Sequence, residues 1–571
     1  MRTTLSPIPA GPRATAVRAA VLAVAMTLAV TPAGAQRGAR GGAMNGAGMS
    51  LGAQADRIFA QFNSTHTPGC AVGAAQNGTT VLARGYGMAD LETGTPITPN
   101  TIFESGSVAK QFTATGILLL VQDGKINLDD PVRKYIPELP EYPRPLLVRH
   151  LLSHTSGLRE WSNLVALAGW PRGSRVHTQA DLLEVVFAQK SLNYPVGDYY
   201  SYTNSGFALL PTIIERVSGM PFDRFEEERI FRPLGLANTG WRSDFTTIVP
   251  GRAQAYARRG GASAGWELDM PFENVIGPGG LLTTVGDWLK WNTALTGRTL
   301  GAAVVDSLTT RAVLTSGRTI SYARGVIVGT YRGTAEIQHS GSTGGYSTFL
   351  ARYPEKGVSI AVLCNAAGAP ATQFTRQLAD ALIPGLAAAS PPDTVAADSA
   401  AAARLAGVYL NARTHELLAV GGANGGGGAG ASVRALRGGG WMLGNNRVLV
   451  DEANGAVTGL RVLGADADTV PYRLVARVPW QPTAQQLAAF AGRYRSDELP
   501  GTVWTVRVDG DQLVASPRPA LDVTLTPAFT DGFRAGAGLG TIWFTRDARG
   551  AVMQMHSGAA RVWDFVFTKA P

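Results

Sequence analysis

Cysteine is almost absent from this sequence, whose 571 residues include only Cys70 and Cys364. Two thiols are too few for a disulfide framework or a cysteine-rich metal site, so both classes of protein are excluded. Each cysteine lies in an apolar stretch that is typical of a strand. Free cysteines are usually buried, so we predict two buried thiols. A single disulfide is the alternative, because the N-terminal residues described below indicate an oxidising compartment.

Charged residues are also sparse, at 16% of the sequence, and the formal net charge is +9. The lysines and arginines are scattered singly along the chain. Recognition of a phosphate backbone needs clustered cations. We therefore predict no nucleic-acid partner.

Histidine is the third scarce residue type, with seven in the chain. His150 and His154 have the i, i+4 spacing that can bind zinc. No H-E-x-x-H pattern and no further pair of ligands accompany them. We predict a structural role for both, and neither a metal nor a cofactor.

A long hydrophobic run occurs only near the start of the chain. Residues 1–35 contain three arginines and no acidic residue, with an apolar run at residues 19–30 and the small-residue site Ala33-Gly34-Ala35. This layout predicts a secretory signal peptide that is cleaved after Ala35, with an uncleaved anchor as the alternative. We expect a periplasmic or secreted protein without a stable membrane span, which begins with a flexible leader at residues 36–50.

The sequence from residue 51 to residue 385 has strand patterns at its two ends and helical patterns between them. Strands are predicted at residues 70–73, 80–82, 346–353 and 358–364, and helices at residues 105–123, 148–153, 180–188, 207–218, 222–231 and 288–295. This order predicts an α/β or α+β domain whose sheet unites the two ends of the region.

The remainder of the chain has no helical pattern. Residues 386–403 are rich in alanine and contain Pro391-Pro392, so they are predicted to form a linker. The sequence Leu-Ala-Gly-Val-Tyr at residues 405–409 returns as Phe-Ala-Gly-Arg-Tyr at residues 490–494. We therefore predict two all-β units, 404–480 and 481–571, which are either two small barrels or two halves of one.

Ser107 and Lys110 stand three residues apart at the start of the predicted helix at residues 105–123, so they share one face. A serine hydroxyl is a weak nucleophile at neutral pH, and a desolvated lysine can accept its proton. The helix N-terminus adds N–H groups where an oxyanion would form. The pattern S-x-x-K is weakly specific when it stands alone.

Two further motifs carry polar groups suited to the same chemistry. In Tyr202-Thr203-Asn204, a phenol beside a lysine can act as a general acid or base, and the amide of Asn204 can hold the lysine or cap the next helix. His339-Ser340-Gly341-Ser342 precedes a predicted strand. There the N–H of Ser342 is a candidate second oxyanion donor, and Gly341 lets the substrate approach closely.

The three motifs together resemble those of the serine β-lactamase and penicillin-binding hydrolases, in particular the class C-like branch with Y-x-N. The resemblance covers residues 51–385 and extends to further stretches at residues 85–90, 150–158, 233–236 and 279–281. It implies a β-lactamase/DD-peptidase-like catalytic domain, with an antiparallel sheet flanked by helices. An all-β, lipocalin-like barrel region follows, similar to the tails of D-aminopeptidases.

The resemblance also implies an acyl-enzyme on Ser107, with proton transfer by Lys110 and Tyr202, either of which could be the general base. True class C enzymes carry Lys-Thr-Gly where this chain has His339-Ser340-Gly341, which is similar to the H-x-G of D-aminopeptidases and related esterases. A histidine is a weaker anchor for a β-lactam carboxylate. We therefore expect hydrolysis of short or D-residue peptides or of small esters, with a β-lactamase or a non-turnover penicillin receptor as alternatives.

Overall fold

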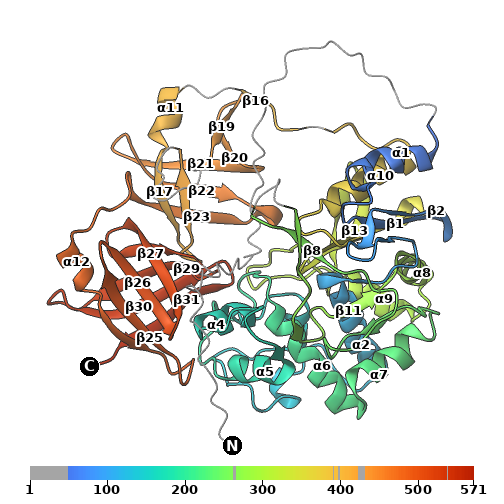
Figure 1. Ribbon diagram of the computed structural model, residues 1–571, viewed down its shortest axis with the longest axis horizontal. Helices are drawn as coiled ribbons and strands as arrows, with labels where there is room; N and C mark the ends of the chain where they lie inside the picture. The colour runs from blue at the N-terminus through green and yellow to red at the C-terminus, as the bar shows by residue number, and fades with distance from the viewer. Residues whose placement is uncertain (1–48, 261–264, 390, 396–398, 422–430, 537) are drawn as a thin grey trace, which may run out of the picture.

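The computed structural model describes residues 49–260, 265–389, 391–395, 399–421, 431–536 and 538–571 (Figure 1). The predicted signal peptide, and the predicted leader up to residue 48, lie outside the described residues. Within the described ranges, every helix is too short or too polar to cross a bilayer.

A six-stranded antiparallel sheet forms the centre of the N-terminal region. Its strand order is β12-β13-β14-β15-β1-β2. The strands are β1 (Cys70–Gln76), β2 (Thr79–Tyr86), β12 (Ile327–Tyr331), β13 (Thr334–Thr343), β14 (Tyr346–Tyr353) and β15 (Val358–Cys364). Because β15 pairs with β1, the sheet joins the two ends of this region, as the sequence predicted.

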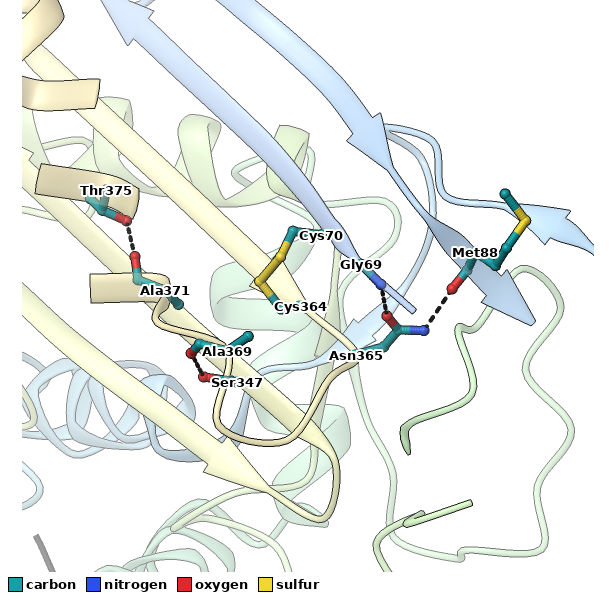
Figure 2. The surroundings of a disulfide bond; sticks show 9 residues. All are labelled: Gly69, Cys70, Met88, Ser347, Cys364, Asn365, Ala369, Ala371 and Thr375. Atoms are coloured by element: carbon teal, nitrogen blue, oxygen red, sulfur yellow. Dashed lines mark hydrogen bonds between the residues drawn. A yellow bond between two sulfur atoms is a disulfide. The ribbon is translucent and has the colours of Figure 1, made fainter. Parts of the chain in front are cut away.

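The two cysteines form a disulfide, so the prediction of two free thiols was wrong. Cys70 opens β1 and Cys364 closes β15, and the two residues face each other in register with their Cα atoms 4.0 Å apart (Figure 2). The two cysteines are 294 residues apart, so no local sequence pattern indicated that they pair. Next to the bridge, the Asn365 side chain accepts a hydrogen bond from Gly69 N and donates one to Met88 O.

Both faces of the sheet are covered, because side chains along a strand alternate between them. Val72 and Ala74 of β1 belong to a core that includes α1 (Leu51–Ile58) and α10 (Ala371–Leu382). Ala71 and Ala75 belong to the larger core on the other face. That core contains residues of α2 (Lys110–Gln122), α3 (Val148–Leu152), α5 (Gln179–Phe187), α6 (Asn204–Ser218), α7 (Phe222–Glu226), α8 (Val285–Thr296) and α9 (Ala302–Thr309).

Short strands lie in the part of the chain between β2 and α8. They are β3 (Met88–Asp90), β4 (Thr95–Pro96), β5 (Phe103–Glu104), β6 (His177–Thr178), β7 (Gly240–Trp241), β8 (Tyr256–Arg258), β9 (Trp266–Leu268), β10 (Glu273–Asn274) and β11 (Leu281–Thr283). The helices predicted from the sequence are present, with ends that differ by a few residues. The predicted helix at residues 105–123 opens with a 3₁₀ turn, Gly106–Ala109, that leads into α2.

The C-terminal part forms two β units. The first is an eight-stranded sheet of β16 (Thr394–Val395), β17 (Gly407–Asn411), β18 (Leu417–Val420), β19 (Val433–Leu436), β20 (Trp441–Leu443), β21 (Asn446–Ala453), β22 (Ala456–Leu463) and β23 (Thr469–Ala476). Its first strand and α11 (Ser399–Arg404) lie in the stretch predicted to be a linker.

The second unit is a closed eight-stranded barrel, hereafter the barrel, and α12 (Ala484–Ala488) precedes it. Its strands are β24 (Gly492–Arg495), β25 (Val503–Asp509), β26 (Gln512–Arg518), β27 (Leu521–Phe529), β28 (Gly532–Ala535), β29 (Gly540–Arg546), β30 (Val552–Ala559) and β31 (Val562–Lys569). The sequence repeat has the same role in both units. Tyr409 OH donates to Leu405 O, and Tyr494 OH donates to Phe490 O.

The barrel shares a core with the N-terminal region through α4 (Trp161–Leu167), a helix that the sequence did not predict. Leu164 and Leu167 are buried among the barrel side chains, and Trp504 Nε1 donates to Leu167 O at 2.9 Å. Arg159 forms an ion pair with Glu498 at 2.7 Å, and both side chains are buried or nearly so, at 5% and 13% exposure. The barrel is therefore packed tightly against this side of the molecule (Figure 1).

Candidate active site

A tight turn at residues 106–107 places Ser107 against the edge of the central sheet. Gly106 has φ +53°, and a Cβ at this position would lie 2.5 Å from the backbone nitrogen of Ser342. Only glycine fits such a contact, because other residues rarely adopt this backbone conformation and have no room here. The turn consequently packs directly on β13.

β13 carries the third motif beside this turn. β12 pairs with β13 only as far as Gln338. From His339 onward, this edge of β13 contacts the turn at residues 106–107 instead of β12. A Cβ on Gly341 would lie 2.0 Å from Ser105 O, and Thr348 Oγ1 donates to the same carbonyl at 2.7 Å. The structure thus brings Gly341 and Ser342 next to Ser107. Their roles in oxyanion binding stay a prediction.

Lys110 is completely buried and has three close partners. Its Nζ lies 3.1 Å from Ser107 Oγ, 2.8 Å from Asn204 Oδ1 and 2.8 Å from Pro278 O. Burial lowers the pKa of Lys110 well below its usual value, and the negative charge of Glu160 opposes this shift. A neutral amine has two N–H donors and one lone pair. The two carbonyl oxygens can only accept hydrogen bonds, so they take both donors, and the lone pair is left for the Ser107 hydroxyl.

Asn204 is held in one orientation by Glu160, a residue that the sequence analysis missed. Asn204 Nδ2 donates to Glu160 Oε1 at 3.1 Å, and the Asn204 backbone N–H donates to Glu160 Oε2 at 2.6 Å. The amide oxygen therefore faces Lys110. The alternative role of Asn204 as a helix cap is not observed, because the side chain of Thr203 caps α6.

Tyr202 lies beside Lys110, whose Nζ is 4.9 Å from the centroid of the phenol ring. The Tyr202 hydroxyl is buried, and among the described residues it has no hydrogen-bond partner at normal distance. Burial raises the pKa of Tyr202, and the neighbouring Ser107 hydroxyl opposes the shift only in part. At neutral pH the phenol is therefore protonated and cannot accept the Ser107 proton, whereas the lowered pKa of Lys110 favours its unprotonated amine.

His339 uses both ring nitrogens for contacts within the protein. Nδ1 lies 2.6 Å from Ser340 O, and Nε2 lies 3.0 Å from the hydroxyl of Tyr322. A carbonyl accepts from Nδ1–H, so the Tyr322 hydroxyl donates to Nε2. Burial, together with the charge of Lys110, lowers the pKa of His339 to about 3. The imidazole is thus neutral at physiological pH.

A small cavity opens beside Ser107 and is lined by Trp161, Arg172, Asn204, Glu273, Val275 and Ser342, among others. Arg172 and Glu273 form a two-point ion pair at 2.5 and 2.7 Å, and the guanidinium lies over the ring of Trp161. The sequence analysis missed these residues. Arg172 and Glu273 are 101 positions apart, and no local pattern marks either one.

His150 and His154 have separate structural contacts. His150 Nδ1 accepts a hydrogen bond from Leu147 N at the start of α3. His154 Nδ1 accepts one from Thr203 N, and its ring centroid is 4.1 Å from that of Tyr202. The His154 ring therefore packs against the Tyr202 ring.

The chain matches the family described as beta-lactamase over residues 55–384, which is more than half of its length. It belongs to this family. The resemblance to the β-lactamase-related, penicillin-binding hydrolases is confirmed, and so is the prediction of an enzyme of the serine-hydrolase type.

Two relatives illustrate the extent of the similarity. Penicillin-binding protein 4* of Bacillus subtilis (strain 168) is 28% identical over 326 residues, which are 53% of this chain and 68% of the relative. A D-aminopeptidase of Brucella anthropi is 33% identical over 228 residues, which are 39% of this chain and 42% of the relative. The matches thus span about two fifths to two thirds of these relatives.

Solved structures show the same fold. The octameric penicillin-binding protein homologue from Pyrococcus abyssi has a TM-score of 0.53 at 22% identity, covering 82% of this chain and 99% of that one. D-amino acid amidase from Ochrobactrum anthropi SV3 has a TM-score of 0.50 at 22% identity, covering 58% and 98%. The predicted fold class is confirmed, with the closed barrel in the C-terminal part.

Proposed function

We propose that the chain is an exported serine hydrolase that cleaves amide or ester bonds through an acyl-enzyme on Ser107. The observation that carries this proposal is the set of contacts around Lys110. Its two donors are taken by Asn204 Oδ1 and Pro278 O, and its pKa is lowered by burial. A neutral amine with its lone pair directed at the Ser107 hydroxyl is an activated nucleophile–base pair.

In the first step, Lys110 accepts the Ser107 proton while Oγ attacks the substrate carbonyl. The resulting oxyanion accepts hydrogen bonds from the backbone N–H groups of Ser107 and Ser342. When the carbonyl–leaving-group bond breaks, the protonated Tyr202 gives its proton to the leaving group, and Lys110 returns the serine proton to Tyr202. Water then releases the acyl group by the same route in reverse.

The third motif favours peptides and small esters over β-lactams. His339 is neutral at physiological pH, so the third motif supplies no cation for a β-lactam carboxylate. Relatives named D-aminopeptidase support a substrate with an amide bond next to a D-residue. The layout of residues 1–35 supports export, and so does the disulfide, because such bonds persist in oxidising compartments.

Turnover is tested by mixing the full chain with a chromogenic ester and, separately, with a D-amino-acid anilide. We expect a steady rate of release that continues well beyond one equivalent of enzyme. A single stoichiometric burst without a steady rate would instead identify a receptor that is acylated but does not release its acyl group.

Replacing Glu160 by glutamine is expected to move the acid limb of kcat/KM to lower pH. The charge of Glu160 raises the pKa of Lys110, so its removal lowers that pKa, and Lys110 stays unprotonated in more acidic solution. The pH profile of ester hydrolysis measures the shift. The matched control is Glu267→Gln, at an exposed glutamate away from this site, which should leave the limb in place. A limb that moves to higher pH in the Glu160 variant would contradict this electrostatic role.

A further inference from the structure

The β30–β31 hairpin of the barrel lies close to the residues around Ser107. Arg561 stands at the turn between β30 and β31, and its carbonyl accepts hydrogen bonds from Asn193 Nδ2 at 2.9 Å and from Glu160 N at 3.2 Å. Asn193 Oδ1 also accepts from Trp563 N at 3.0 Å. The tip of the hairpin is therefore fixed on Glu160, the residue that orients Asn204.

The side chain of Arg561 lies at the catalytic tyrosine. Its guanidinium carbon is 4.9 Å from the centroid of the Tyr202 ring. Within the ranges that the structure describes, the guanidinium has no hydrogen bond and no ion pair. Two other arginines near this junction have a carboxylate partner, since Arg159 contacts Glu498 and Arg413 contacts Asp468.

Arg561 is also the cation that the rest of the site leaves available. Burial lowers the pKa of Lys110 and of His339, which disfavours the charged form of both, and Arg172 is engaged by Glu273. A guanidinium has five donors in a planar fork that matches a carboxylate at two points. At Tyr202, no carboxylate of the described residues binds that fork.

The position of Arg561 indicates which side of the substrate it contacts. The cavity beside Ser107 is lined by Trp161, Arg172 and Glu273 and does not include Arg561. In the proposed mechanism Tyr202 protonates the leaving group. A side chain on the Tyr202 ring is therefore on the leaving-group side of the scissile bond.

We propose that Arg561, supplied by the barrel, binds a carboxylate on the leaving group and is the residue that selects short peptides with a free C-terminal carboxylate next to the scissile bond. This inference rests on the proposed function. It assigns the barrel a direct part in substrate choice, through one side chain whose backbone is locked by Asn193 and Glu160.

The test measures binding rather than turnover, in full-length chains that carry Ser107→Ala. Isothermal titration with D-alanyl-D-alanine and with its C-terminal amide compares two ligands that differ only in the carboxylate. With Arg561 present, we expect the acid to bind about tenfold or more tightly than the amide. Arg561→Gln should bring this ratio to about one, and Arg561→Lys should keep part of it.

Arg534→Gln is the matched control, because Arg534 is an exposed arginine on the same barrel. It should leave the ratio unchanged. Near-ultraviolet circular dichroism of each variant shows whether the barrel is intact, and Arg561→Gln should preserve it because the hairpin is held by backbone contacts. Equal affinity for the two ligands with Arg561 present, a ratio that survives Arg561→Gln, or no binding of either ligand would overturn the proposal.

Failure of the proposed function would be seen separately. If the native chain shows no turnover and no adduct on Ser107, while the carboxylate preference still depends on Arg561, the hydrolase proposal fails, and Arg561 is a carboxylate-binding residue that selects no leaving group.

Discussion

Replacing Lys110 by methionine is expected to lower kcat for ester or amide hydrolysis by about a hundredfold to ten-thousandfold, the usual contribution of a positioned general base. Methionine has nearly the same length and fits a buried site, so the fold should persist. The lost group is the amine that lies 3.1 Å from Ser107 Oγ. Steady-state kinetics and a thermal melt of the same sample measure the two effects.

The matched control for this change is Lys290→Met, at a half-exposed lysine paired with Asp287 on α8. That variant should keep native kcat. If Lys110→Met retained more than a tenth of native kcat with an unchanged melt, another group would have to be the base. Tyr202 would then be the candidate, although burial raises its pKa.

Replacing Arg159 by leucine is expected to destabilise the packing of the barrel on the N-terminal region by about 3–5 kcal/mol. The reason is that Glu498, whose side chain is 13% exposed, would lose its ion-pair partner. The hydrogen bond from Arg159 Nη2 to Asp564 O, close to Arg561, would be lost as well. Thermal melts and limited proteolysis at the junction would report the change.

An exposed ion pair on the same barrel provides the comparison. Arg507 and Asp522 have side-chain exposures of 42% and 54%, so Arg507→Leu should cost at most about 1 kcal/mol. Equal losses in the two variants, or a neutral Arg159→Leu, would show that the buried pair does not hold the barrel in place.

Local sequence patterns predicted that Ser107 and Lys110 lie side by side, because residues at i and i+3 in one helical turn share one face. They also predicted the strands at residues 346–353 and 358–364, which are rich in apolar and aromatic residues. The motif at Tyr202 and Asn204 was informative only in combination with the other two. Each motif and each strand is a pattern of residues close together in the chain.

The features that sequence reasoning missed depend on distant residues. Cys70 and Cys364 pair across 294 residues, and Arg561 reaches Tyr202 from the other end of the chain. Glu160 is a single acid with no repeating pattern around it. Helix α4 is only seven residues long, and Leu164 and Leu167 on its apolar surface pack in the core of the distant barrel. Tertiary packing, rather than local propensity, creates each of these.

The most direct test of the central claim is intact-mass and peptide mass spectrometry after treatment with a fluorophosphonate probe. The native chain should gain one adduct, located on Ser107, and the rate of labelling should fall sharply in Lys110→Met. Ser107→Ala should gain none. Undiminished labelling of Ser107→Ala, or an adduct on another residue of the native chain, would contradict the account.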